Sequence, residues 1–155
     1  MNVKELTVLE ILRELELFNE LKEPQLRKLA HIAEEAQFET DEYIYHEGEL
    51  GKGIFIIQQG EIIIEMLLPE HGPVVLYTLL PGQLFGWSSL LAGRRKKARA
   101  RAARPTRAIF IDANKVRDLF RQDHDLECRL MNCIISVMAD RLYLTRESLA
   151  HKSTR

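Results

Sequence analysis

The 155-residue sequence has few of the features that covalent cross-links, metal sites or membrane segments require. Its two cysteines, Cys128 and Cys133, lie five residues apart and form neither a disulfide framework nor a CxxC pair. The five histidines show no metal-ligand spacing such as HExxH, and no apolar run approaches 18 residues. We therefore expect a cytoplasmic protein with no metal site and no membrane contact.

Catalytic patterns are also missing from the sequence. No nucleophile lies in a recognisable arrangement with a base, and no pair of carboxylates has a context typical of acid–base chemistry. Glu61 and Glu65 flank strand residues, and we expect both of them to face solvent. The sequence thus favours a non-enzymatic protein.

Charge is unevenly distributed along the chain, although the net charge is only −1. Eight of the 22 basic residues lie within 94–107, where there is no acidic residue. The remaining 14 basic residues stand against 23 acidic ones. One surface of the protein should therefore differ in charge from the rest, and contact with nucleic acid through 94–107 is one hypothesis.

The periodicity of apolar residues predicts one domain over 1–155 with three regions. Apolar residues at three-to-four spacing predict two helices within 1–37, the second continuing through Ala36 after a first-turn Pro24. Short runs rich in Ile, Tyr and Phe, separated by glycines, predict strands over 38–112. Helical spacing returns over 113–155. The predicted fold is mainly β, a small antiparallel β-barrel of the jelly-roll (double-stranded β-helix) type, with N-terminal helices and a long C-terminal helix.

Two features of the C-terminal half point to contacts. The segment "KARARAA" alternates, so that small alanines share one strand face and basic residues the other. The last helix carries two apolar stripes, one of which repeats at 4-3-4-3-4 spacing: Met131, Ile135, Met138, Leu142, Thr145 and Leu149. One stripe can pack on the barrel while the other meets a partner helix, and this spacing predicts a homodimer formed by the C-terminal helix.

The order of these elements resembles the cyclic nucleotide-binding domain family, and within it the sensor domains of bacterial regulators of the catabolite activator type. Four segments carry the resemblance: "HEGELGKGIFIIQQGEIII", "LLPGQLFGWSSLL", "ARARAARPTRAIFID" and "MADRLYLTRESLA". The resemblance covers nearly the whole chain. It implies a ligand-sensing domain with a phosphate-binding cassette, here residues 82–98.

In that family the cassette reads approximately Phe-Gly-Glu-Leu-Ala/Ser and, about ten residues later, Arg-Ser/Thr-Ala. The resemblance implies that N–H groups at the start of a short helix and the arginine bind the cyclic phosphate, while the glutamate accepts the ribose hydroxyl. Carried over to this chain and to its last helix, it gives these candidate ligand-binding residues: Phe85, Gly86, Trp87, Ser88, Lys96, Lys97, Ala98 and Thr145.

Both charged positions of the cassette depart from the family pattern. Trp87 replaces the glutamate, and Lys96 takes the arginine position, although a one-residue shortening leaves Lys97 as an alternative cation. Losing a hydrogen bond to a charged acceptor costs roughly 1.5–3 kcal/mol, and lysine cannot make the bidentate contact of arginine. Together these changes predict cyclic nucleotide binding weakened by about two to four orders of magnitude.

Several interpretations follow for function. The first is a ligand sensor for cAMP, cGMP or another small anion, in which binding at the cassette repositions the last helix. The second is a degenerate domain in which Trp87 fills the pocket and the protein acts in dimerisation or docking. Thr145, at the base-contacting position of the family, serves either the ligand or the register of a dimer seam. The chain is expected to be a stand-alone sensor or a fragment of a longer regulator.

Overall fold

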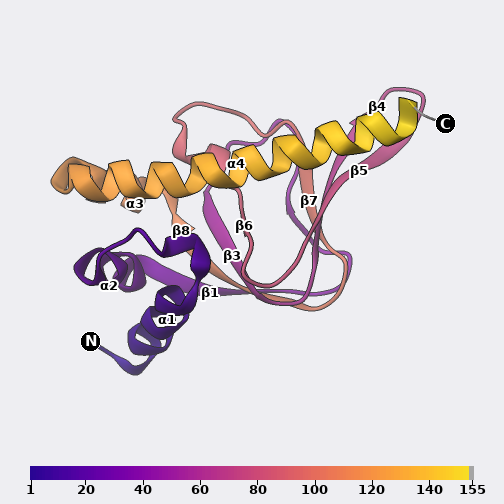
Figure 1. Ribbon diagram of the computed structural model, residues 1–155. Helices are drawn as coiled ribbons and strands as arrows, with labels where there is room; N and C mark the ends of the chain where they lie inside the picture. Colours follow the sequence, from indigo (N-terminus) through magenta and orange to yellow (C-terminus); the bar gives the residue numbers. More distant parts are fainter. Residues whose placement is uncertain (154–155) are drawn as a thin grey trace.

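The computed structural model describes residues 1–153, beginning with helices that pack beside a β-sandwich (Figure 1). These are α1 (Val3–Glu14), the short 3-10 helix η1 (Glu16–Phe18) and α2 (Glu23–Ile32). The prediction that the second helix continues through Ala36 is wrong. Ala33–Phe38 forms strand β1, which pairs residue by residue with β8 (Thr106–Asp112). This ladder gives the backbone N–H and C=O groups their hydrogen-bond partners, and it outweighs the helical spacing of the alanines.

Within residues 1–153, eight strands form two four-stranded antiparallel sheets, which face each other as a sandwich (Figure 1). The first sheet has the order β1-β8-β3-β6, and its other two strands are β3 (Gly53–Gln59) and β6 (Leu84–Phe85). The second has the order β2-β7-β4-β5, namely Tyr43–Tyr45, Arg99–Ala102, Ile62–Leu68 and Gly72–Leu79. The predicted antiparallel jelly-roll fold with flanking helices is confirmed, with its strands divided between two sheets.

Two hydrophobic cores lie on opposite faces of the first sheet. Strand β3 shows why: Phe55 and Ile57 point into the sandwich, whereas Ile54 and Ile56 point toward the helices. Alternation along a strand sends successive side chains to opposite faces, and here both faces are covered. The continuous apolar run "GIFII" is therefore a strand that is buried on both sides.

The C-terminal region consists of α3 (Ala113–Gln122) and the 30-residue α4 (His124–Ser153). The Asp112 side chain caps α3 by accepting a hydrogen bond from the Lys115 N–H at 3.0 Å. Helix α4 begins among the other helices and then crosses the sandwich (Figure 1). Its buried side chains, from Leu126 to Ile134, all belong to the helical core.

Beyond Ile134 the apolar side chains of α4 lie at the surface. Ile135, Leu142 and Leu149 of the predicted seam are 58%, 51% and 60% exposed. Of the second stripe, which consists of Leu126, Leu130, Ile134, Val137 and Leu144, the first three side chains are buried in the helical core, whereas Leu144 is 54% exposed. No helix within residues 1–153 is long and apolar enough to cross a membrane.

Candidate functional site

The turn of the cassette contains a glycine, Gly86, that no other residue could replace without strain. Gly86 follows β6 and adopts a φ of 79°, in the left-handed region. A Cβ atom at this position would lie 2.7 Å from the Gly53 carbonyl oxygen. Glycine therefore permits both the turn and the close approach to β3, and the 3-10 helix η2 (Trp87–Leu90) starts directly after it.

Lys96 returns from the end of the cassette to this turn. Its side chain is 5% exposed, and its ammonium group donates to Ser88 Oγ at 3.0 Å and to the Gly86 carbonyl at 3.3 Å. The same Nζ lies 4.5 Å from the centroid of the Tyr45 ring. The structure thus brings the predicted cation together with Gly86 and Ser88, and it adds the aromatic face of Tyr45.

The electrostatic environment of Lys96 lacks a counter-ion. No ion pair within residues 1–153 includes its ammonium group. Burial lowers the pKa of Lys96 from its ordinary value of 10.5 to about 8, because desolvation disfavours the charged form. At neutral pH the cassette therefore holds a charged ammonium group whose hydrogen-bond acceptors, Ser88 Oγ and the Gly86 carbonyl, are both neutral.

The other predicted cassette residues fall into two groups. Phe85 is fully buried and stacks on Phe55 with ring centroids 4.9 Å apart, and Ala98 packs against the same core. Lys97 is exposed, so of the two candidate lysines only Lys96 reaches the cassette turn. The side chains of Phe85 and Ala98 shape the site, whereas Ser88 presents a hydroxyl group to the buried ammonium.

Trp87 lies on the helical side of the cassette. It is half-buried and packs against the helical core, which contains residues such as Leu90, Val116 and Leu126. The core between the two sheets consists of other residues, among them Phe55 and Phe85. The tryptophan at the family's glutamate position thus contributes to helical packing and presents no carboxylate to the cassette.

Thr145 reaches the sandwich from α4. Its hydroxyl oxygen lies 3.1 Å from the Tyr77 hydroxyl of β5 and also donates to the Arg141 carbonyl at 2.9 Å. One turn earlier, the Arg141 guanidinium donates a hydrogen bond to the Leu84 carbonyl of β6 and lies 5.9 Å from the Tyr77 ring centroid. Burial lowers the pKa of Arg141. Arg141 therefore links α4 to β6, whereas Thr145 links it to β5.

Sequence reasoning missed three residues of this site, Tyr45, Tyr77 and Arg141. Spacing could have identified Arg141, because it precedes Thr145 by four residues and so lies on the same helix face. The two tyrosines are contributed by strands β2 and β5, far from the cassette in sequence. Burial raises the pKa of the Tyr45 hydroxyl to about 12, so Tyr45 stays neutral beside Lys96.

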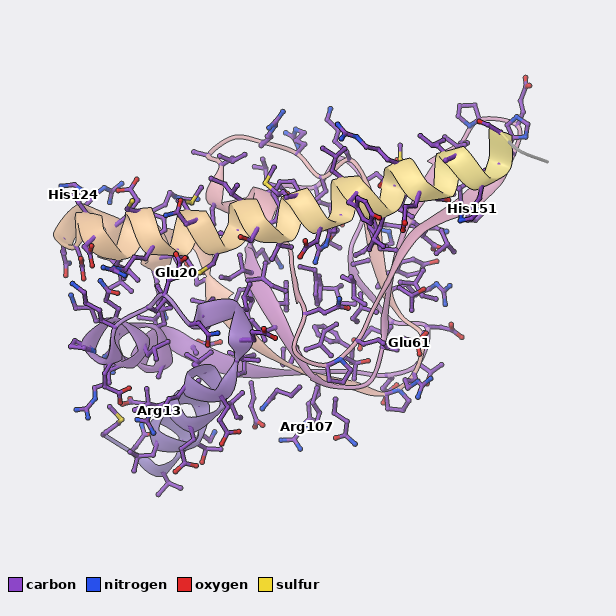
Figure 2. The ribbon with its side chains drawn as sticks, in the orientation of Figure 1. Arg13, Glu20, Glu61, Arg107, His124 and His151 are labelled. Atoms are coloured by element: carbon purple, nitrogen blue, oxygen red, sulfur yellow. The ribbon has the colours of Figure 1, made fainter. Side chains whose placement is uncertain are left out.

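Carboxylates pair with half of the eight basic residues in segment 94–107. Four of its arginines form ion pairs: Arg99 with Glu65, Arg101 with Glu65 and Asp41, Arg104 with Glu61, and Arg107 with Glu35. Glu61 and Arg107 lie on the side of the sandwich away from α4 (Figure 2). The expectation that Glu65 faces solvent is wrong, since its residue exposure is only 3%. A strand residue on the outer face of the sheet is buried here because two arginine side chains cover it.

Comparison with known proteins agrees with this geometry. A profile of the cyclic nucleotide-binding domain matches residues 35–123. A candidate cyclic nucleotide-binding protein from Geobacter metallireducens is 26% identical with a TM-score of 0.77, over 92% of this chain and 99% of its own. The Thermus thermophilus catabolite activator protein is 21% identical with a TM-score of 0.71, over 88% of this chain and 62% of its own.

A eukaryotic structure shares the same fold. The regulatory domain of Toxoplasma gondii PKA, crystallised with cAMP, is 17% identical with a TM-score of 0.71, and the match covers 90% of this chain and 50% of that one. No curated protein matches the sequence. Because the family profile spans more than half of the residues and the two-sheet fold agrees, the chain belongs to the cyclic nucleotide-binding domain family.

Proposed function

We propose that this domain is a non-enzymatic, cytoplasmic ligand sensor whose cassette binds a small anion through Lys96. The observation that carries the proposal is the buried ammonium of Lys96, held by Ser88 Oγ and the Gly86 carbonyl without a carboxylate. A buried charge is costly unless it is paired, and an anionic ligand would supply the missing partner. Membership of the cyclic nucleotide-binding family, and the shared fold of the Toxoplasma domain that was crystallised with cAMP, support a ligand at this fold.

Cyclic nucleotides are expected to bind weakly at this site. A lysine ammonium contacts a phosphate as a point charge, without the two parallel hydrogen bonds of a guanidinium. Trp87 packs on the helical core and offers no oxygen to a ribose hydroxyl. We therefore propose an affinity for cAMP and cGMP about two to four orders of magnitude below that of a cassette with arginine and glutamate.

Isothermal titration calorimetry of cAMP and cGMP tests this proposal. We expect binding in the high micromolar to millimolar range, lost in Lys96→Gln and retained in the control Lys97→Gln, whose side chain is exposed. An absence of heat at millimolar ligand would remove these two nucleotides as ligands. Anion binding that persists in Lys96→Gln would contradict the assignment of Lys96.

We further propose that two copies associate through α4. The seam residues Ile135, Leu142 and Leu149 present a continuous apolar stripe at heptad spacing, and each is more than half exposed. Sedimentation equilibrium should give a dimer for the wild type and a monomer for Ile135→Glu combined with Leu142→Glu. A doubly substituted chain that sediments as a dimer would reject the seam.

The alternative is a docking domain that binds no small molecule, and one observation favours it. Trp87 packs as a core residue does, and the neighbouring Gly51 lies so close to Ser89 and Lys96 that a Cβ there would meet both side chains. Nucleic-acid binding is less favoured, since ion pairs occupy four of the eight basic residues of 94–107.

A further inference from the structure

Arg141, which contacts β6 just before the cassette turn, is a second cation without a counter-ion in the described part of the chain. Its guanidinium is partly buried, donates to the Leu84 carbonyl and lies over the Tyr77 ring. Within residues 1–153, no ion pair includes Arg141. A guanidinium carries five N–H donors, and a backbone carbonyl together with an aromatic face uses only some of them.

Lys96 and Arg141 both lie near Tyr45. The ammonium of Lys96 faces the Tyr45 ring at 4.5 Å and donates to the Gly86 carbonyl, while Arg141 donates to the Leu84 carbonyl two residues earlier; the charge of Arg141 also acts to lower the pKa of the Tyr45 hydroxyl, against the larger effect of burial. Phe85 packs beside Tyr45, with ring centroids 6.4 Å apart. Two positive charges therefore flank a set of aromatic side chains with no acidic residue paired to either.

Two neighbouring arginines elsewhere in the sandwich, Arg99 and Arg101, are paired with carboxylates. Arg99 and Arg101 share the buried carboxylate of Glu65 at 2.8 and 3.5 Å, and Arg101 also pairs with Asp41 at 2.9 Å. These two arginines thus form ion pairs with two carboxylates. Lys96 and Arg141 differ from these arginines, because within residues 1–153 neither of them has a carboxylate partner.

Arg141 can be reached from outside the sandwich. It lines a groove of about 1,050 Å³ between α4, β5 and the segment that joins α1 to α2, together with Tyr77, Leu84 and Val137. The groove also contains the carboxylates of Glu14, Glu16, Glu20 and Asp140, none of which forms an ion pair with Arg141. Glu20 lies beside the N-terminal helices (Figure 2).

From this arrangement we infer that the ligand carries two anionic groups, one bound by Lys96 and the other by Arg141. This inference rests on the proposed function and narrows its ligand class. A cyclic nucleotide has one negative charge and would leave one of the two cations unpaired. A dianion would neutralise both, as Glu65 and Asp41 do for the neighbouring arginines. Its two ends would also tie α4 to the cassette.

Two matched pairs of probes test this inference on the full chain. Inorganic pyrophosphate is compared with orthophosphate, and adenosine 3′,5′-bisphosphate with cAMP, by calorimetry at pH 7 and constant ionic strength. The second pair keeps base and ribose and changes the number of anionic groups. In at least one pair we expect the probe with two anionic groups to bind at least about 10-fold more tightly to the wild type, a fold-change that direct titration resolves.

Substitutions then assign the second anion. Arg141→Gln should remove that 10-fold preference and leave the affinity for the single-anion probe within about 3-fold, whereas Arg141→Lys should keep part of the preference. The exposed Arg94→Gln serves as the control and should change neither affinity. Thermal unfolding without ligand checks that each variant is folded.

The outcomes separate this inference from the proposed function. If Lys96→Gln abolishes binding of all probes but Arg141→Gln keeps the preference, the second anion site is wrong and the sensor stands. The same conclusion follows if neither pair shows a preference in the wild type. If Lys96→Gln leaves every affinity unchanged, the sensor site itself is rejected.

Discussion

Replacing Lys96 by methionine should stabilise the protein, because the wild type carries an unpaired charge in a buried place. The pKa of Lys96 is lowered from 10.5 to about 8, and each unit corresponds to 1.36 kcal/mol. The charged side chain therefore costs the native state about 3 kcal/mol at neutral pH. Methionine has a similar length and no charge, so Lys96→Met should recover most of this free energy, less the two hydrogen bonds it loses.

The stabilisation of Lys96→Met relative to wild type should depend on pH. Between about pH 8 and pH 10.5 the unfolded chain keeps its lysine proton while native Lys96 loses it, so the native state gains stability as pH rises. The cost is complete below about pH 8 and disappears by about pH 10.5. The difference in unfolding free energy between Lys96→Met and wild type should therefore shrink steadily as pH rises from 8 to 10.

Urea denaturation at pH 7 and pH 9.5 measures that difference, and heating provides a second readout. For a chain of this size, 3 kcal/mol corresponds to about 6–12 °C in Tm. Lys97→Met is the matched control, and it should change little at either pH because Lys97 is exposed. A Lys96→Met variant that is less stable than wild type by the same amount at both pH values would refute the reasoning.

Two further substitutions test the frame around the site. Glu65→Gln should lower the free energy of unfolding by about 3–5 kcal/mol in urea denaturation, because Arg99 and Arg101 would lose their buried carboxylate. Glu61→Gln, at the more exposed pair with Arg104, is the comparison, and an equal effect of the two substitutions would contradict this. Gly86→Ala should unfold at a lower urea concentration than Gly48→Ala. Both glycines have positive φ, but only at Gly86 would the new Cβ meet a backbone atom, the Gly53 carbonyl oxygen. Equal urea midpoints would show that this close approach to β3 is unimportant.

The sequence predicts the fold well where pattern and local chemistry agree. The glycine-bounded apolar runs give the strands, and the alternation of "RARA" gives a strand with its alanines inward, as Ala100 and Ala102 show. The same rules fail for Ala33–Phe38, where pairing with β8 overrides helical spacing. Local periodicity contains no information on which distant strand will supply backbone partners.

Side-chain environments were harder to predict than elements. Counting residues along the sequence cannot decide whether Lys96 or Lys97 enters the cassette. In the structure, an antiparallel β-bridge pairs Arg95 with Leu50, which lies 45 residues earlier, and this contact helps to fix the position of the neighbouring lysines. Glu65 was placed on the correct strand but with the wrong exposure, since its burial depends on side chains from β7. Tyr45 and Tyr77 join the site only through the folding of the two sheets.

The two halves of α4 are attached to the rest of the domain to different extents, and a bound ligand would act mainly on the less attached half. Buried side chains hold the helix only as far as Ile134, and the following 19 residues, about 28 Å of helix, have none. Over that stretch Arg141 and Thr145 make polar contacts to the sandwich. Amide protons beyond Ile134 should exchange with solvent far sooner than those before it. A few kcal/mol gained near Arg141 would then be enough to change the rigidity of half the helix.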